Sequence, residues 1–483
     1  MKNIRKSVLI NFIWRVLEKM GTQIITLAVS VILARILTPE DYGIIAIISI
    51  LISVLTVFVD SGLGTALIQK KEVDETDFSS VFFGQIVLCI AFYVILFFAA
   101  PLGASIFHKP EMTVMIRVLG ISLIVAGIKN IQVAYVSRNM IFRKFFVATL
   151  GGTVFAAGIA IWLAERGSGP WSLIAFHLFN NTIDTIILWI IVKWRPKMHF
   201  SFKRLKILFS FGWKLMVSSA LDTIFSKVQG LLIGKLYTET DLGYYDQGNR
   251  WPNAVTENVN FSIDSILLPT MSTEQEHIDR VKLMTKRAIM AGMFVMAPLL
   301  SWMAFCGKPF FRLLLTEKWG PMYPFLFVFS MGYILYPIHT ANLNAIKAVG
   351  RSDLFLILEL IKKGIGIVLL FITIPISPMA ICIASLVLSI ICVFVNMWPN
   401  RKLIGYGIGE QFKDVLPVLA LALASGGCVY WIQYLPFKDW LVVLIQLFAG
   451  FGIYLLGAKL FKLESFRYTM VLLKDFVRKE DEA

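Results

Sequence analysis

The sequence is short of charge and of cysteine. Only 16% of its 483 residues are Asp, Glu, Lys or Arg, against roughly 25% in ordinary soluble domains. Its five cysteines all lie inside apolar runs, and none shows CxxC or metal-finger spacing, so we expect them to be small core residues. The low charge argues against a water-soluble fold, and the cysteines imply no disulfide framework.

Catalytic and nucleotide-binding motifs are absent as well. The sequence contains no Walker P-loop, HExxH, GxSxG or EF-hand pattern, and its histidines are scattered without paired ligand spacing. These absences argue against an ATP-driven pump and against a metalloenzyme. We therefore expect a protein that is not an enzyme and that holds no metal and no organic cofactor.

What the chain does have is a series of long apolar runs. Its mean hydropathy is +0.74, and runs of about 20 apolar residues, enough to span a bilayer, follow one another with short polar connections. The predicted helices cover residues 8–33, 43–67, 78–100, 112–132, 145–164, 170–192, 207–236, 243–270, 286–306, 322–345, 355–374, 379–398, 414–435 and 440–460. The predicted fold is all-α and polytopic, with about fourteen transmembrane helices. The first run lacks an A-x-A cleavage site, so we expect an uncleaved first helix.

The net charge of +15 indicates membrane topology rather than nucleic-acid binding. Most Lys and Arg residues fall in alternate loops, and the loop at residues 193–206 is the most basic of them. Cytoplasmic loops carry such an excess of Lys and Arg. An even number of helices then places both termini in the cytoplasm.

An internal repeat predicts how the chain is divided. Residues 33–43 align with residues 233–243, and each segment links the first and second helices of a six-helix set. The repeat predicts an N-lobe at residues 1–204, a C-lobe at 205–412, and a C-terminal helix pair with a tail at 413–483. An even helix number gives both copies the same orientation, and a transporter keeps its substrate site in a cavity between two such lobes.

The eighth predicted helix carries polar residues on one face. They recur at spacings of three and four: Asp246, Arg250, Asn253, Glu257, Asn260 and Asp264. The stripe covers about 27 Å, close to the hydrocarbon thickness of a bilayer. Because ionisable groups are costly in lipid, a water-filled cavity is the favoured interpretation. An amphipathic surface helix and a sealed polar core remain alternatives.

Three other helices carry sparser polar faces. Lys214 and Asp222 lie on one face of the seventh helix, with Lys227 beside it, while Arg15 and Lys19 lie on the first helix and Asp60 ends the second. These residues are candidate cavity groups. The alternatives are that Arg15, Lys19 and Lys214 only snorkel to the interface, and that Asp60 is structural.

Several segments resemble Wzx-type polysaccharide flippases of the multidrug/oligosaccharidyl-lipid/polysaccharide exporter superfamily. Residues 33–43 resemble the L-A-R-x-L-x-P-x-x-[YF]-G signature that follows the first helix of that family. Residues 60–64, 211–214, 233–235, 242–245, 268–269 and 317–319 match further family segments in order and spacing. The resemblance covers essentially the whole chain.

The resemblance implies a fold of two six-helix lobes plus a C-terminal pair in a bacterial inner membrane. It also implies export of undecaprenyl-diphosphate-linked oligosaccharide by alternating access, with H⁺ or Na⁺ coupling and with a polysaccharide polymerase and glycosyltransferases as possible partners besides membrane lipid. Relatives place cations of the first and eighth helices in the cavity, which correspond to Arg15 and Arg250. Acidic Asp222, Glu257 and Asp264 are candidates for coupling. Competing hypotheses are a multidrug or cation exporter and a membrane glycosyltransferase or polymerase.

Overall fold

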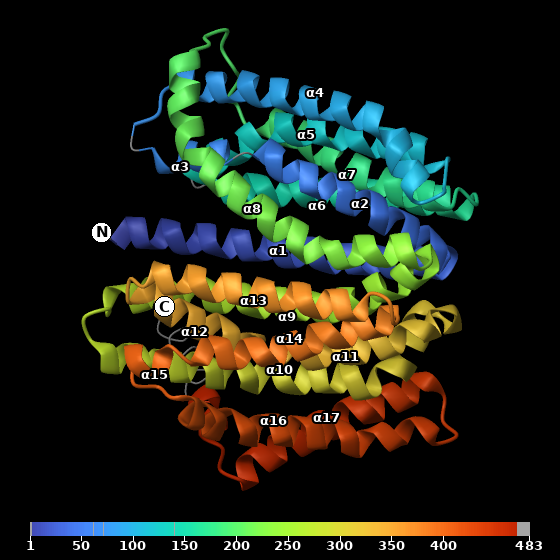
Figure 1. Ribbon diagram of the computed structural model, residues 1–483, viewed down its shortest axis with the longest axis vertical. Coiled ribbons are helices and arrows are strands. Elements are labelled where there is room, and N and C mark those ends of the chain that lie inside the picture. Colours follow the sequence, from blue (N-terminus) through green and yellow to red (C-terminus); the bar gives the residue numbers. More distant parts are fainter. Residues whose placement is uncertain (1, 61, 71, 140, 471–483) are drawn as a thin grey trace. The chain divides into compact units, whose positions relative to one another are not determined.

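The computed structural model describes residues 2–60, 62–70, 72–139 and 141–470, and in these ranges the chain forms helices joined by short connections (Figure 1). The elements are α1 (Lys2–Ile36), α2 (Pro39–Asp60), α3 (Leu63–Gln69), α4 (Glu75–Ile106), α5 (Met112–Arg138), α6 (Phe142–Glu165), α7 (Pro170–Ile191), α8 (Phe202–Leu236), α9 (Glu239–Thr273), α10 (Ile278–Leu315), η1 (Glu317–Met322), α11 (Tyr323–Tyr333), α12 (Tyr336–Ala348), α13 (Ser352–Thr373), α14 (Pro378–Met397), α15 (Asn400–Leu403), α16 (Ile408–Tyr430), η2 (Trp431–Tyr434) and α17 (Asp439–Leu460).

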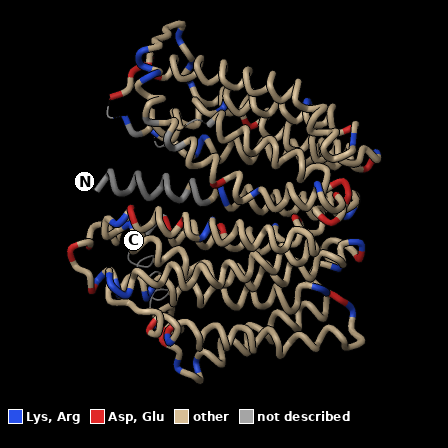
Figure 2. Tube along the Cα trace, in the orientation of Figure 1, with Lys and Arg blue, Asp and Glu red and all other residues tan. Residues whose placement is uncertain are grey.

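The described residues include 11 helical segments that are long and apolar enough to cross a membrane. Charged residues gather near helix ends and are sparse in between (Figure 2). The prediction of an all-α, multi-pass membrane protein is therefore confirmed, whereas the count of fourteen spanning helices is not. Every predicted run forms helix, but α8, α9 and α13 are not among the 11 segments. All three carry charged residues along their length, which lowers their apolar character.

Two predicted spans are each broken into two helices. The run at 43–67 divides into α2 and α3 at Gly62, whose φ of +63° is left-handed. A Cβ at Gly62 would lie 2.6 Å from the carbonyl oxygen of Gly212 on α8, so glycine satisfies both the backbone angle and the close approach. The run at 322–345 divides into α11 and α12 just before Pro337, because proline fits the first turn of a helix better than its interior.

The chain falls into two compact units, Met1–Gly243 and Tyr244–Ala483. In the first unit, α8 packs against α2, α3 and α4. A buried core there includes Leu67 of α3, Phe78 of α4, Ile131 of α5 and Leu188 of α7. The predicted division at residues 204 and 412 stays a prediction, because it follows the repeat whereas the units are defined by packing.

In the second unit, α10 packs against α11, α12, α16 and α17. Two side chains bind backbone carbonyls across these contacts: the Ser301 hydroxyl donates to Ala422 (2.8 Å), and the Tyr454 hydroxyl donates to Phe294 (3.0 Å). Such bonds satisfy polar groups that have no water partner in a membrane. They hold the C-terminal pair α16 and α17 on α10.

The two copies of the repeat have the same local structure. Thr38 and Asp41 bond to each other at the start of α2, with 2.8 Å between the hydroxyl and the carboxylate. Thr238 and Asp241 do the same at the start of α9, at 2.7 Å. Each pair is a capping box that satisfies otherwise free amide groups of the first turn. The repeated sequence therefore specifies two identical helix starts.

These two helix starts also touch through matching glycines. A Cβ at Gly43 would lie 1.8 Å from the carbonyl oxygen of Glu239, and a Cβ at Gly243 would lie 2.1 Å from that of Pro39. The partners are related by the same offset of 200 residues that relates the two copies. The contact is backbone against backbone, which only glycine permits at this separation.

Candidate functional site

The polar stripe of α9 keeps one exposed face in the second unit. Asp246, Glu257 and Asp264 are exposed, while Arg250, Asn253 and Asn260 are half-buried. None of these six side chains is enclosed, which differs from the sealed-core alternative. The other side of α9 packs closely: a Cβ at Gly248 would lie 2.7 Å from the Cβ of Phe325 on α11, and the Trp251 ring lies 5.0 Å from that of Phe311 on α10. Packing on one side turns the polar side away from the core.

Amide and hydroxyl groups of α12 form hydrogen bonds with the C-terminal end of the stripe. Asn344 donates to the Asp264 carboxylate at 2.5 Å, and Thr340 donates to Asn260 at 3.3 Å. Within α9 itself, Asn253 donates to Glu257 at 2.8 Å. The Asp264 and Glu257 carboxylates therefore each accept a hydrogen bond from a neutral amide.

Arg250 is the exception on this face. It lies one turn after Asp246 and is half-buried, yet it makes no hydrogen bond or ion pair with another residue in the described ranges. A half-buried guanidinium has five donors to satisfy. The arrangement leaves those donors available to an anion.

A second polar group in this unit was missed by the sequence reasoning. Lys362 and Glu359 of α13 form an ion pair at 2.5 Å, with side chains 13% and 29% exposed. His339 of α12 lies close to them in the fold and contacts Ser389 (3.3 Å) and Asn396 (3.0 Å) of α14. The sequence contains a signal for this group, because Glu359, Lys362 and Lys363 interrupt an apolar run. The apolar residues on either side predicted a membrane span there, and these charged residues were not taken as site candidates.

In the first unit, the predicted cavity residues lie on α1, α2 and α8. Lys19 is half-buried on α1, and both Asp222 and Lys227 are exposed on α8. The side chains of Arg15, Asp60 and Lys214 lie outside those that the structure describes. The role of all six stays a prediction.

The sequence reasoning also missed an ion pair inside the first unit. Lys129 of α5 lies 2.5 Å from Asp184 of α7, and the Asp184 side chain is only 3% exposed. Gly152 of α6 makes room for it, because a Cβ there would lie 2.9 Å from the Cβ of Asp184. Removing one partner of a buried ion pair strongly destabilises a protein, because the other charge is left buried without a counter-charge. A single acid within the apolar run of α7 was the available signal.

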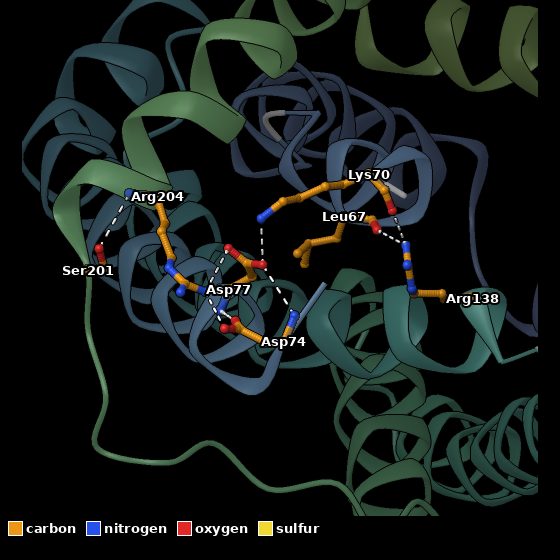
Figure 3. Close-up of polar contacts among 7 residues, drawn as sticks. All are labelled: Leu67, Lys70, Asp74, Asp77, Arg138, Ser201 and Arg204. Atoms are coloured by element: carbon orange, nitrogen blue, oxygen red, sulfur yellow. Dashed lines mark hydrogen bonds and ion pairs between the residues drawn. The ribbon is translucent and has the colours of Figure 1, made fainter. Parts of the chain in front are cut away.

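Charged residues also gather where α3, α4 and α8 meet, and Figure 3 shows them with their neighbours. We call Lys70, Asp74, Asp77 and Arg204 the charge cluster. The Asp77 side chain is 1% exposed and accepts from Lys70 at 2.6 Å, while Arg204 pairs with Asp74 and lies 3.6 Å from Asp77. Asp74 and Asp77 also form the capping box of α4. The cluster ties the start of α8 to α4.

Within the charge cluster, the pairing of Asp74 with Arg204 favours the ionised state of both groups. The hydrogen bond from Arg204 lowers the pKa of the Asp74 carboxyl, helped by the Asp77 amide. The same bond raises the pKa of Arg204. Next to it, the Arg138 guanidinium donates to the backbone carbonyls of Leu67 and Lys70, each at 2.7 Å. Arg138 therefore fixes the end of α3 to α5.

The stripe of α9 combines one cation, Arg250, that has no partner among the described residues with carboxylates that accept hydrogen bonds from amides. No group of three or more His, Cys, Asp or Glu residues with metal-binding geometry occurs in the described part of the chain. Carboxylate and amide oxygens are the ligands that a hard cation prefers. The arrangement suits binding and release of ions and of an anionic ligand.

Comparisons with known proteins show the family of the chain. A family model described as "Polysaccharide biosynthesis protein" matches residues 32–324. The succinoglycan biosynthesis transport protein ExoT of Rhizobium meliloti (strain 1021) is 26% identical over 72% of this chain and 70% of its own length. The lipopolysaccharide biosynthesis protein WzxC of Escherichia coli (strain K12) is 19% identical over 67% of this chain and 66% of its own.

One solved structure, described as lipid II flippase MurJ in an inward closed conformation, has the same fold. Its TM-score is 0.76 at 16% identity, and the match covers 93% of this chain and 98% of that chain. Together with the family match, this likeness confirms the resemblance inferred from the sequence segments.

Proposed function

The chain belongs to the polysaccharide biosynthesis protein family, and on that premise we propose that it carries a lipid-linked oligosaccharide across a membrane. The family match, the relatives named as transport and lipopolysaccharide biosynthesis proteins, and the flippase fold support this function. The proposed substrate is undecaprenyl-diphosphate-linked oligosaccharide. The proposed location is a bacterial inner membrane, with both termini in the cytoplasm.

The observation that carries the proposal is the guanidinium of Arg250, which has no hydrogen-bond or ion-pair partner among the residues that the structure describes. A half-buried guanidinium has five donors to satisfy, and those of Arg250 meet no partner in the described part of the chain, so an anionic ligand would supply the counter-charge. Arginine binds phosphate through two parallel hydrogen bonds. A lipid diphosphate supplies the matching anion, and Arg15, Lys19, Lys214 and Lys227 are proposed to bind the same group along its path.

The carboxylates of the stripe are proposed to couple transport to H⁺ or Na⁺. Asp264 and Glu257 each accept from an asparagine amide, and Asp60, Asp222 and Asp246 are further candidates. Protonation or Na⁺ binding would reduce the negative charge near Arg250 and strengthen anion binding. An ion that binds one conformation better shifts the equilibrium toward it, which is the thermodynamic requirement for alternating access.

The protein is proposed to transport its substrate without altering it. Its loops are short, whereas glycosyltransferases and polymerases usually carry their catalytic residues in large loops outside the membrane. A flippase receives its lipid-linked substrate from glycosyltransferases and delivers it to a polymerase on the other side of the membrane. These two enzyme classes are the proposed partners.

The test is transport of a labelled lipid-linked oligosaccharide in proteoliposomes. Arg250→Gln should lower the translocation rate roughly tenfold to hundredfold, since a charge-assisted hydrogen bond contributes about 1.5–3 kcal/mol. Arg280→Gln is the matched control, because Arg280 is exposed and pairs with Glu274 at the start of α10. Wild-type transport by correctly inserted Arg250→Gln would refute the role of Arg250. Equal rates with and without imposed pH and sodium gradients would refute ion coupling.

Export of an organic cation is the second candidate, and the exposed carboxylates Asp246, Glu257 and Asp264 favour it. Arg250 on the same face opposes it by repulsion. In the same vesicles, a transported organic cation with no movement of the oligosaccharide would decide for this alternative.

A further inference from the structure

A cavity of about 880 Å³ lies in the second unit, where the chain passes from α14 through α15 to α16. Its lining includes the side chains of Trp398, Arg401, Lys402 and Glu410 and the backbone around Gly407. The volume is within the range of about 300–1,000 Å³ typical of small-ligand sites. None of these residues belongs to the polar stripe of α9.

The charge of the cavity is positive. Glu410 is neutralised by Lys282, whose ammonium lies 2.8 Å from its carboxylate and also donates to the Gly405 carbonyl at 2.7 Å. Arg401 and Lys402 are exposed, and neither forms an ion pair with a residue of the described ranges. Two cations therefore line the cavity with no counter-charge from the described residues.

Bare backbone forms part of the wall. Gly405 has a left-handed φ of +65°, and Gly407 caps α16 without any side-chain hydrogen bond. A Cβ at Gly409 would meet nothing within 4 Å. The first amide groups of a helix lack intrahelical acceptors. At the start of α16 these N–H groups can donate to an anion, in addition to the donors of the two cations.

The cavity lies at the level of the membrane interface. One candidate span ends at Leu403 and the next begins at Ile408. Trp398 follows the last residue of α14 and is 67% exposed, as tryptophans at the membrane–water interface commonly are. Lipid phosphates lie at this depth, and basic interfacial pockets bind the headgroups of acidic lipids.

We propose that this cavity binds the phosphodiester headgroup of an anionic phospholipid. Arg401 and Lys402 bind the phosphate, the glycine backbone approaches it closely, and Trp398 packs beside the glycerol region. The site is independent of the oligosaccharide pathway proposed for α9. It gives the second unit a specific lipid contact at the membrane face assigned to the cytoplasm.

The test is native mass spectrometry of the full-length protein in detergent, titrated with phosphatidylglycerol, phosphatidylcholine or inorganic phosphate. The wild type should retain phosphatidylglycerol in preference to phosphatidylcholine. The double variant Arg401→Gln/Lys402→Gln should bind phosphatidylglycerol about 30-fold more weakly, at about 1 kcal/mol for each basic residue. Gly409→Phe fills the cavity without changing charge and should also lose the preference.

The control is Lys459→Gln/Arg467→Gln, which removes one lysine and one arginine that are exposed but do not line the cavity. The control should bind as the wild type does. Equal loss in the control would show a diffuse surface charge and overturn the site. Unchanged binding in either cavity variant would overturn it too, and full competition by inorganic phosphate would show that the site takes a free phosphate instead of a lipid.

Discussion

Replacing Gly43 by alanine puts a methyl carbon where the backbone of Glu239 already lies. The new Cβ would be 1.8 Å from the Glu239 carbonyl oxygen and 2.5 Å from its carbonyl carbon, whereas ordinary van der Waals contact begins at about 3.4 Å. The starts of α2 and α9 must therefore separate by about 1.6 Å. Overpacking usually lowers the free energy of unfolding by about 1–3 kcal/mol. Here the new methyl group meets a backbone carbonyl, which cannot move aside by changing rotamer as a side chain can, so we expect a loss at the upper end of that range.

The measurement is thermal unfolding of the purified protein in detergent. A cost of about 3 kcal/mol corresponds to a melting temperature lower by roughly 6 °C for a cooperative unit of the size of Met1–Gly243. Gly158→Ala is the matched control, because Gly158 is also helical and an added Cβ there would meet nothing within 4 Å. Alanine is the better helix former, so the control should melt at the wild-type temperature or slightly above it.

Gly243→Ala tests the symmetry of the same contact. Its Cβ would lie 2.1 Å from the Pro39 carbonyl oxygen, so a comparable loss is expected. The double variant should lose less than the sum of the single losses, because one separation of the two helix starts relieves both clashes. If Gly43→Ala had the same melting temperature as the control Gly158→Ala, the close backbone contact would be refuted. If the loss in the double variant equalled the sum of the two single losses, the two substitutions would be unrelated defects.

Three further predictions concern stability. Asp74→Asn keeps a helix-capping residue but loses the ion pair with Arg204. That pair lowers the pKa of Asp74 in the folded protein. Its stabilising contribution is therefore fully present above the unfolded pKa of about 4 and is lost as the pH falls through the folded pKa. Wild type and variant should therefore differ in melting temperature at neutral pH and converge as the pH falls below the lowered pKa of Asp74, and a constant difference would contradict the linkage. Arg312→Lys keeps the charge but loses the two-pronged bond to Asp439, and should lower the free energy of unfolding by about 1 kcal/mol in denaturant titration; Arg312→Gln should cost more, and equal losses would argue against a contribution of charge. Gln411→Leu removes both hydrogen bonds that Gln411 shares with the buried amide of Asn342 and should cost about 2 kcal/mol in the same assay, an expectation that wild-type stability would exclude.

The path of the helices could be predicted because it depends on hydrophobicity along the chain. Runs of apolar residues must form helix in lipid, where every backbone group needs an internal partner. The breaks inside two runs depend on three-dimensional contacts instead. Gly62 interrupts its span because α8 lies against it at Gly212, and no periodicity announces a neighbour so distant in sequence.

The candidate site was predictable only in part. The spacing of the stripe places Arg250 and Glu257 on one face of α9, because helical periodicity is local. Pairs between helices, such as Lys129 with Asp184, follow from tertiary packing. A lone acid in an apolar run shows that a partner is needed without showing where it lies.

By itself, the sequence determined an all-helical membrane protein, the polar face of α9, and a repeat whose two copies carry the same capping residues. Each of these depends on residues within a few turns of one another. Only the tertiary structure decided that α8 packs with the first unit, that Arg250 has no described partner while its neighbours do, and that Gly43 and Gly243 meet at the helix starts. Those outcomes depend on which distant segments pack together, and packing is set by the shapes and charges of whole helices rather than by any local pattern.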